Sequence, residues 1–183
     1  MQVTPTRLPE VLLIEPSAIA DARGFFMESW NQRVFDEAVG TAVRFVQDNH
    51  SQSPRGVLRG LHYQLKHPQG KLVRVVSGRV FDVAVDLRRS SPRLGRWVGV
   101  ELSAENRRQM WVPPGFAHGL LVLSERADVL YKVSEYHHPE DDHSLAWDDP
   151  HVAVQWPLDE LGSAPTLSDR DRSAAHWDTA PLY

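Results

Sequence analysis

A histidine and an arginine lie within a short apolar, glycine-punctuated segment, residues 56–64, with the sequence GVLRGLHYQ. This composition is typical of a buried β-strand. His62 in such a strand is either a packed core histidine or a catalytic base, because imidazole exchanges protons near neutral pH. The segment at residues 69–86 carries further ionisable side chains in strand-like sequence: Lys71, Arg74, Asp82 and Asp86. Ionisable groups inside β-structure require either solvent or a ligand.

Strand alternation separates the two chemical groups of residues 56–64. In a regular strand, His62 lies on one face with Leu58 and Gly60, and Arg59 lies on the other face. If Arg59 and His62 serve one pocket, the strand must be irregular between them. Gly60 is the residue that would accommodate such a bulge or twist.

A second histidine follows a turn of proline and glycine. Pro113, Gly115 and His118 resemble the P-x-G-x-x-H half-motif of cupins, in which the turn delivers a histidine to the mouth of a small barrel. Metal-binding cupins add an H-x-H pair and a glutamate from an earlier strand. Here the matching place reads H-Y-Q at residues 62–64, so the second histidine is missing and a three-ligand metal site is poorly supported. A cupin barrel whose side chains act directly is the better prediction.

Composition limits the class of protein. With 183 residues, the chain is long enough for one domain with a substantial core, and we expect residues 1–183 to form a single domain. The absence of cysteine excludes disulfide scaffolds, thiolate zinc sites and cysteine nucleophiles. The net charge of -4, with both signs intermixed, argues against a nucleic-acid partner. The longest apolar run near the start, residues 11–14, is too short for a signal or membrane segment, so we expect a cytoplasmic protein with no membrane partner.

Short apolar runs alternate with Gly, Pro, Asn and Asp clusters, as in all-β sandwiches and barrels. Strands are predicted at about residues 43–49, 57–64, 72–76, 79–86, 97–102, 109–112, 119–123 and 129–133. The strongest hairpin signal joins two of these, residues 72–76 and 79–86, through Ser77-Gly78. Two helices are predicted, one at about residues 32–39 between Asn31 and Gly40, the other starting near Ser168. The expected fold is mainly β, a cupin-type jelly roll or β-sandwich barrel with a few short peripheral helices.

Taken together, these segments resemble one family, the dTDP-4-dehydrorhamnose 3,5-epimerases. The matching stretches agree with the family in order and spacing over nearly the whole chain: residues 21–30, 45–51, 56–64, 69–86, 111–119, 130–132, 147–150 and 167–171. The resemblance implies a cupin-type jelly roll, usually a homodimer, whose catalysis needs neither a metal nor an organic cofactor. It also implies a dTDP-4-keto-6-deoxyhexose as the substrate, in dTDP-L-rhamnose synthesis.

The reaction of this family explains the residue types. In a 4-keto-6-deoxyhexose the hydrogens at C3 and C5 both lie α to the C4 carbonyl, so removal of either gives an enolate. Epimerisation then needs a base, an acid on the far side of the ring, and a positive donor near the carbonyl oxygen. The resemblance implies that His62 is the base and Tyr131 the acid. Lys71 is the natural group to stabilise the enolate oxygen.

The resemblance also implies that an aspartate in the C-terminal segment orients the base, and the family's L-S-x-x-D pattern places it at Asp171. A carboxylate on one ring nitrogen would fix the tautomer of His62 and stabilise its imidazolium. The alternative is structural. Ser168 with Asp171 three residues later resembles a capping box, in which Asp171 serves only its own helix end.

Substrate binding falls to the remaining matches. These are Arg23, Glu28, Gln47, Asp48, Asn49, Arg59, His118, Asp142 and Arg170. Guanidinium and imidazole groups suit a diphosphate and a keto-sugar, whereas Glu28 or Asp48 alone would be an ordinary solvated residue. Three positions depart from the family pattern: Asp142 replaces glutamate, His143 replaces arginine and Arg170 replaces lysine. The loop after His62 is also one residue shorter, so the alignment of Lys71 needs a gap before Gln69.

Three functions fit these residues. The first is a double epimerase acting at C3 and C5 of dTDP-4-dehydro-6-deoxy-D-glucose. The second is a relative that epimerises one carbon only or takes another nucleotide. The third is a non-catalytic cupin that binds a nucleotide sugar, and a base, an acid and a cation together argue against it because binding alone needs no such set.

Overall fold

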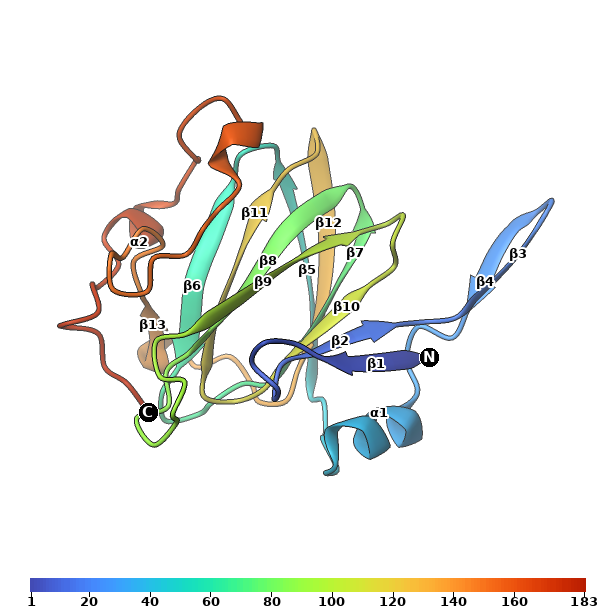
Figure 1. Cartoon of the computed structure of the whole chain (residues 1–183), viewed down its shortest axis with the longest axis horizontal. Helices are drawn as coiled ribbons and strands as arrows, with labels where there is room; N and C mark the ends of the chain where they lie inside the picture. Colours follow the sequence, from blue (N-terminus) through green and yellow to red (C-terminus); the bar gives the residue numbers. More distant parts are fainter.

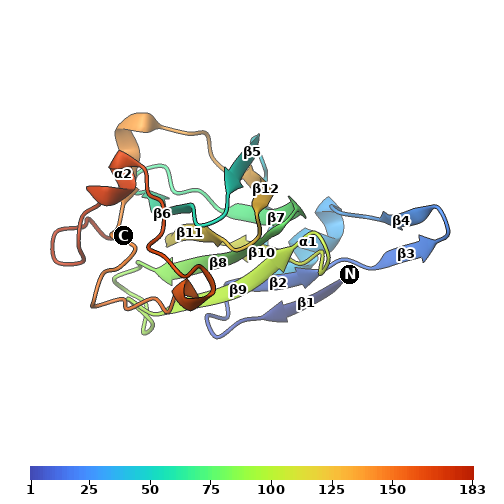
Figure 2. The ribbon, with the colours of Figure 1, turned by 90° about the horizontal axis from the view of Figure 1, so that it is seen from above.

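Two antiparallel β-sheets pack face to face in the computed structural model, which describes all residues from 1 to 183 (Figures 1 and 2). Six strands form one sheet in the order β1 (Gln2–Pro5), β2 (Leu12–Glu15), β10 (Gln109–Val112), β7 (Lys71–Ser77), β12 (Arg126–Val133) and β5 (Gln47–Pro54). Five strands form the other in the order β13 (Asp142–Ser144), β6 (Leu58–Gln64), β11 (Phe116–Val122), β8 (Arg79–Asp86) and β9 (Trp97–Ser103). The predicted mainly β, jelly-roll sandwich is confirmed.

The core between the sheets also fixes where polar side chains point. Alternate apolar residues of β7, β8, β11 and β12 form one buried cluster, to which both sheets contribute. Lys71 is two residues from Val73 of this cluster, and Asp82 is two residues from Val80. His118 likewise alternates in step with cluster residues of β11. Strand periodicity therefore directs these three polar side chains inward.

Helix α1 (Gln32–Val39) covers part of the outer face of the six-stranded sheet, where Phe35 packs with Trp111. Its ends follow the sequence prediction. The Asn31 side chain accepts a hydrogen bond from the Val34 N–H, and Gly40 ends the helix with φ +78°. None of the helices reaches the length and apolar character that crossing a membrane would require.

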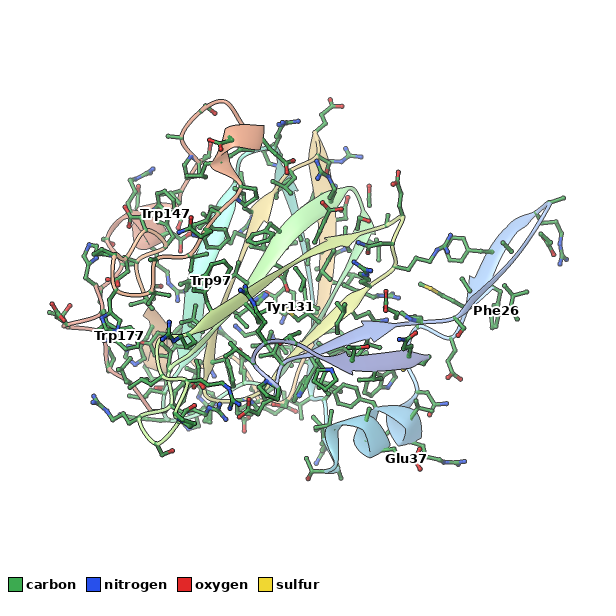
Figure 3. The ribbon with its side chains drawn as sticks, in the orientation of Figure 1. Phe26, Glu37, Trp97, Tyr131, Trp147 and Trp177 are labelled. Atoms are coloured by element: carbon green, nitrogen blue, oxygen red, sulfur yellow. The ribbon has the colours of Figure 1, made fainter.

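The C-terminal third of the chain covers the outer face of the five-stranded sheet. Leu58, Leu61 and Tyr63 of β6 are buried there in a second apolar cluster, against which Trp147 and Trp177 pack (Figure 3). This segment holds two 3-10 turns, Pro139–Asp141 and Leu158–Glu160, and the one-turn helix α2 (Asp169–Arg172) with Ser168 as its N-cap. The second predicted helix is therefore confirmed at its start and is short.

A two-stranded hairpin, β3 (Ala18–Asp21) and β4 (Gly24–Met27), extends away from the sandwich (Figures 1 and 2). Ile19 and Phe26 are each 74% exposed, and Phe25 is 54% exposed. Phe25 contacts the Arg107 guanidinium, whose Cζ lies 4.3 Å from the ring centroid. The hairpin thus offers apolar surface that its own chain leaves largely uncovered.

Two strand predictions were wrong in position or pairing. The strand predicted at residues 43–49 begins at Gln47 and continues to Pro54, because Val43 and Phe45 pack against the α1 cluster instead. The predicted hairpin through Ser77-Gly78 does not form, since β7 pairs with β10 and β12 whereas β8 pairs with β9 and β11. Gly78 instead carries the chain from one sheet to the other with φ +77°.

Five strands lay outside the prediction. They are β1, β2, β3, β4 and β13, each of three or four residues. Runs this short give no clear alternation in sequence, so pairing with a longer neighbour defines them. The strand predicted from residue 119 also begins earlier, at Phe116, and the strand predicted from residue 129 begins at Arg126.

Candidate active site

An irregularity in β6 brings Arg59 and His62 to the same side of the strand. His118 of β11 lies opposite His62, and Leu120 lies opposite Arg59. The chain therefore advances three residues along β6 while it advances two along β11, which is a β-bulge. Gly60 lies within the extra step with φ +117°, and a Cβ there would lie 2.6 Å from the Cα of Gly119. The bulge predicted at Gly60 is confirmed.

His62 forms a close pair with Asp171. The Nε2 atom of His62 lies 2.6 Å from Oδ1 of Asp171, and the two side chains are 28% and 4% exposed. Burial lowers the pKa of His62 from its ordinary value, although the hydrogen bond with Asp171 acts in the opposite direction. Asp171 therefore orients the imidazole, and burial favours its neutral form, as a base requires.

Asp171 serves its helix and His62 at the same time. Its Oδ2 accepts a hydrogen bond from the Ser168 hydroxyl at 2.7 Å, and the Ser168 Oγ accepts one from the Asp171 N–H. Burial acts to raise the pKa of Asp171, but the hydrogen bonds from His62 and Ser168 lower it overall. The capping interaction and the histidine pair thus use different oxygens of one carboxylate, so one does not exclude the other.

Lys71 and Tyr131 come from the opposite sheet. Lys71 lies on β7 and Tyr131 on β12, two strands that pair directly, whereas His62 lies on β6 of the facing sheet. The Lys71 side chain is buried, and its ammonium makes one long contact, 3.5 Å to the His62 carbonyl oxygen. Burial lowers the pKa of Lys71 to about 8 and raises that of Tyr131. Figure 3 shows Tyr131 within the body of the sandwich.

His118 has a buried carboxylate partner that sequence analysis did not assign to the site. Its Nε2 lies 2.8 Å from Oδ1 of Asp82, whose side chain is fully buried in the middle of β8. The signal in the sequence that could have identified Asp82 is its alternation with the core residues Val80 and Ala84, which directs its carboxylate inward. Two histidine–aspartate pairs therefore lie on neighbouring strands, because His118 is opposite His62 in the register.

Asp142 and Arg170 form an ion pair beside these groups. One guanidinium nitrogen of Arg170 contacts Oδ2 of Asp142, and the Arg170 Nε donates to the Ser144 hydroxyl at 2.8 Å. The His137 Nε2 lies 3.1 Å from the same Asp142 oxygen. Burial acts to raise the pKa of Asp142, and Arg170 and His137 lower it overall. The Asp142 and Arg170 substitutions thus preserve a charge pair between β13 and α2.

Gln64, also missed as a site residue, holds the neighbouring loops in place. Its amide nitrogen donates to the carbonyl oxygens of His67 and Tyr136, at 2.7 and 3.1 Å, and its Oε1 accepts from the His138 N–H at 2.8 Å. This is the position at which the H-x-H pair of metal-binding cupins has its second histidine. Nowhere in the chain do three or more His, Cys, Asp or Glu side chains form a cluster that could hold a metal ion.

The three polar residues 47–49 of β5 divide between two faces. Asn49 lies opposite Tyr131 in the β5–β12 register and accepts a hydrogen bond from the Gln47 amide at 2.8 Å. Asp48 alternates with them and pairs at 3.0 Å with Lys132, which is next to Tyr131 in sequence. Gln47 and Asn49 therefore share the face of Tyr131, whereas Asp48 points to the opposite face of the sheet.

Arg23 and Glu28 lie apart from this cluster within one chain. Arg23 is on the turn of the projecting hairpin, where its guanidinium pairs with Asp21 at 2.6 Å. Glu28 follows the hairpin and accepts a hydrogen bond from the Asn31 amide at 3.1 Å. The structure brings together His62, Lys71, Tyr131, Asp171, Arg59, His118, Asp142 and Arg170, with Gln47 and Asn49 on the adjoining edge strand.

Comparison with known proteins gives a consistent result over the full chain. A family model described as dTDP-4-dehydrorhamnose 3,5-epimerase matches residues 5–179. Two curated relatives are dTDP-4-dehydrorhamnose 3,5-epimerases, from Pseudomonas aeruginosa and Shigella flexneri. They are 58% and 56% identical to this chain, and each alignment covers 100% of this chain and 99% of the relative. A solved structure of a dTDP-6-deoxy-D-glucose-3,5-epimerase from Legionella pneumophila, in complex with dTDP-4-keto-L-rhamnose, has a TM-score of 0.94 at 49% identity, covering 100% of this chain and 98% of that one.

Proposed function

Because the chain belongs to the dTDP-4-dehydrorhamnose 3,5-epimerase family, we propose that it epimerises dTDP-4-dehydro-6-deoxy-D-glucose at C3 and C5 to give dTDP-4-dehydro-L-rhamnose. The observation that carries this proposal is the placement of a base and an acid on facing sheets. His62 lies on β6 and Tyr131 on β12, with the buried Lys71 beside Tyr131 on β7. A sugar ring between the sheets would meet the base on one face and the acid on the other.

His62 is proposed to remove the hydrogen at C3 or C5 as a proton. When the Nε2–H of His62 donates to Asp171, the lone pair of the neutral ring is on Nδ1, and this atom takes the proton. The C–H bonding electrons move towards C4, and the carbonyl oxygen becomes the enolate oxygen. Asp171 then stabilises the imidazolium that results.

Tyr131 is proposed to return a proton to the same carbon from the opposite face. Burial raises the pKa of Tyr131, so its hydroxyl is protonated at neutral pH and is available as a donor. The enolate electrons re-form the carbonyl group, and the configuration at the carbon is inverted. Exchange of protons with water restores His62 and Tyr131, and the same set of groups then acts on the second carbon.

Lys71 is proposed to stabilise the enolate oxygen. An ammonium in a buried, low-dielectric site interacts with a developing negative charge more strongly than it would in water. With a pKa of about 8, Lys71 is mostly protonated at pH 7. Losing one such donor typically costs about 10²–10³ in turnover.

The nucleotide diphosphate is proposed to bind through the remaining polar residues. Arg59 and His118 line the same interior and offer guanidinium and imidazole donors to anionic oxygens. Arg170 supplies a further cation next to Asp171, and Asp142 fixes its orientation. Hydrogen bonds from Gln47 and Asn49 would complete the contacts at the β5 edge, whereas Asp48 faces away and binds only if substrate reaches the other face.

A homodimer is proposed as the functional unit. Arg23 lies on the turn of the projecting hairpin and Glu28 directly follows the hairpin, so neither joins the cluster around His62 within one chain. The exposed Ile19, Phe25 and Phe26 need a partner to cover them. A second copy would bring its own Arg23 and Glu28 to the substrate.

Two coarser expectations accompany this function. We propose that residues 1–183 act as one domain, which agrees with a core cluster shared by both sheets. A cytoplasmic location is proposed because a doubly charged nucleotide diphosphate sugar does not cross a bilayer unaided and must be used where it is made.

Incubation with dTDP-4-dehydro-6-deoxy-D-glucose in deuterated water tests the function. We expect deuterium at both C3 and C5, because each epimerisation passes through an enolate that is reprotonated from exchangeable groups. Deuterium at one carbon only would favour a mono-epimerase of a related pathway. No deuterium at either carbon, with binding intact, would leave a nucleotide-sugar-binding protein and refute the proposal.

A further inference from the structure

Asp82 is a fully buried carboxylate with one oxygen left without a partner. Its Oδ1 lies 2.8 Å from the Nε2 of His118, and its Oδ2 is buried and forms no hydrogen bond. Most buried carboxylate oxygens are satisfied by donors, because an unpaired one loses its hydration without compensation. Asp86, four residues along the same strand, shows the usual case, since Arg88 and Ser91 donate to its two oxygens.

Lys71 is a buried cation that also has too few hydrogen-bond partners. Its ammonium has three hydrogens to donate but makes only the 3.5 Å contact with the His62 carbonyl oxygen. Lys71 and Asp82 both alternate in step with residues of the core between the sheets, one on β7 and the other on β8. A positive and a negative side chain, each incompletely bonded, thus face the same interior.

We propose that Asp82 is a positioning residue for the epimerisation, holding the His118 ring through Oδ1 and supplying, through Oδ2, the negative charge that stabilises the Lys71 ammonium. The inference rests on the proposed role of Lys71 at the enolate oxygen. Asp82 itself does not touch the substrate in this scheme. It acts through the two side chains that do.

The charges around Lys71 explain why a second carboxylate is needed. Asp142 of β13 and Asp82 of β8 both favour the protonated amine, whereas burial and Arg170 of α2 disfavour it. His62 of β6 adds a further positive charge after it has taken a proton from the sugar. The other titratable groups that face this interior from the neighbouring strands are Arg59 of β6, His118 of β11 and Tyr131 of β12. Asp142 is already paired with Arg170 and His137, whereas the only side-chain partner of Asp82 is His118, so Asp82 is the carboxylate whose charge no Arg or Lys side chain in contact with it offsets.

Neutral substitutions at Asp82 separate this role from simple support of the fold. Asp82→Asn keeps an oxygen that accepts from His118, whereas Asp82→Ser removes most of that contact, and both remove the charge. We expect the alkaline limb of kcat/KM, which reports Lys71, to move to lower pH by about one unit in both variants. At a pH of about 8.5, that shift appears as a loss of up to tenfold relative to wild type, and it is largely recovered near pH 6.5. A higher KM in Asp82→Ser than in Asp82→Asn would report the His118 contact.

Asp86→Asn is the matched control. It also neutralises a buried carboxylate of β8, but Asp86 is already paired with Arg88, which lies outside the cluster around His62. We expect a loss of thermal stability with no movement of the alkaline limb. The melting temperatures of Asp82→Asn, Asp82→Ser and Asp86→Asn show which variants fold. The pH profile is then compared with wild type for each Asp82 variant that folds.

The outcomes distinguish this inference from the proposed function. A shifted alkaline limb in the folded neutral variants, with an unshifted Asp86→Asn, supports the role of Asp82. An alkaline limb that coincides with wild type in a folded Asp82 variant overturns it. Wild-type protein that introduces no deuterium at C3 or C5 would instead refute the epimerase function itself, independently of Asp82.

Discussion

The interior between the two sheets and the projecting hairpin at residues 18–27 are both built from β-strands, but their polar and apolar side chains are partnered very differently. In the interior, His62, His118 and Asp142 each have a charged partner in the same chain. On the hairpin, two aromatic rings and Ile19 are largely exposed, and Arg23 is paired only with its near neighbour Asp21.

The difference separates what one chain can complete from what it cannot. Groups that transfer protons need fixed positions, and these come from long paired strands that are buried on both sides. A two-stranded hairpin is marginally stable on its own and gains a fixed position only when another surface covers it. The interior should therefore determine whether chemistry occurs, and the hairpin should determine how well the active assembly forms.

Replacing His62 should have the largest effect and tests the interior directly. His62→Asn keeps a hydrogen-bonding side chain but removes the proposed base, so deuterium incorporation at both C3 and C5 should fall roughly 10³-fold. Circular dichroism and the melting temperature serve as controls for folding. Loss at one carbon with normal exchange at the other would show that a second base acts, and the single-base scheme would be wrong.

Replacing Asp171 should have the next largest effect. Asp171→Asn keeps the size of the side chain and its contact with Ser168, but it no longer stabilises the imidazolium of His62, so kcat should fall by about two orders of magnitude or more. Asp169→Asn is the matched control, because Asp169 lies on the same helix turn, is solvent-exposed and pairs with Arg172. Near-normal turnover in Asp171→Asn would reduce Asp171 to a helix-capping residue.

The hairpin should respond in assembly rather than in chemistry. Phe25→Ser with Phe26→Ser removes apolar surface worth roughly 1.5–3 kcal/mol per fully buried ring, so the dissociation constant of the dimer should rise by at least about tenfold. Sedimentation across a concentration series measures it. Tyr136→Ser, an exposed aromatic outside the hairpin, should leave association unchanged. A double variant that associates like wild type would contradict the role of the hairpin.

The pH dependence of the wild type should show the smallest effect. His62 must be neutral to act as a base, and because burial lowers its pKa, the acid limb of kcat/KM should lie below the ordinary histidine pKa of about 6.5. Lys71 must be protonated, and its pKa of about 8 should produce the decline on the alkaline side. Tyr131 remains protonated beyond that point because its pKa is raised. An acid limb above pH 6.5 would show that burial does not dominate the pKa of His62.

Much of the fold followed from periodicity and turn residues. The strands around residues 58–64, 79–86, 97–103 and 109–112 are long or apolar enough to be recognised, and α1 has clear signals at both ends. The polar strand β5 was misplaced, because QDNHSQSP has no apolar alternation and is defined by pairing with β12. The false hairpin at Ser77-Gly78 arose because a glycine turn signals a change of direction without signalling which sheet the next strand joins.

The sequence by itself determined the chemical groups and their family pattern: His62, Lys71, Tyr131 and Asp171, with a glycine at position 60 where the strand could bend. Only the tertiary structure decided which of these groups meet. The bulge at Gly60 turned Arg59 and His62 to one side, and the pairing of β8 with β11 within one sheet set Asp82 beside His118. It also placed Arg23 on the turn of a hairpin that projects away from the sandwich. The physical reason is that residue types are local properties, whereas register, sheet pairing and burial depend on partners distant in the chain.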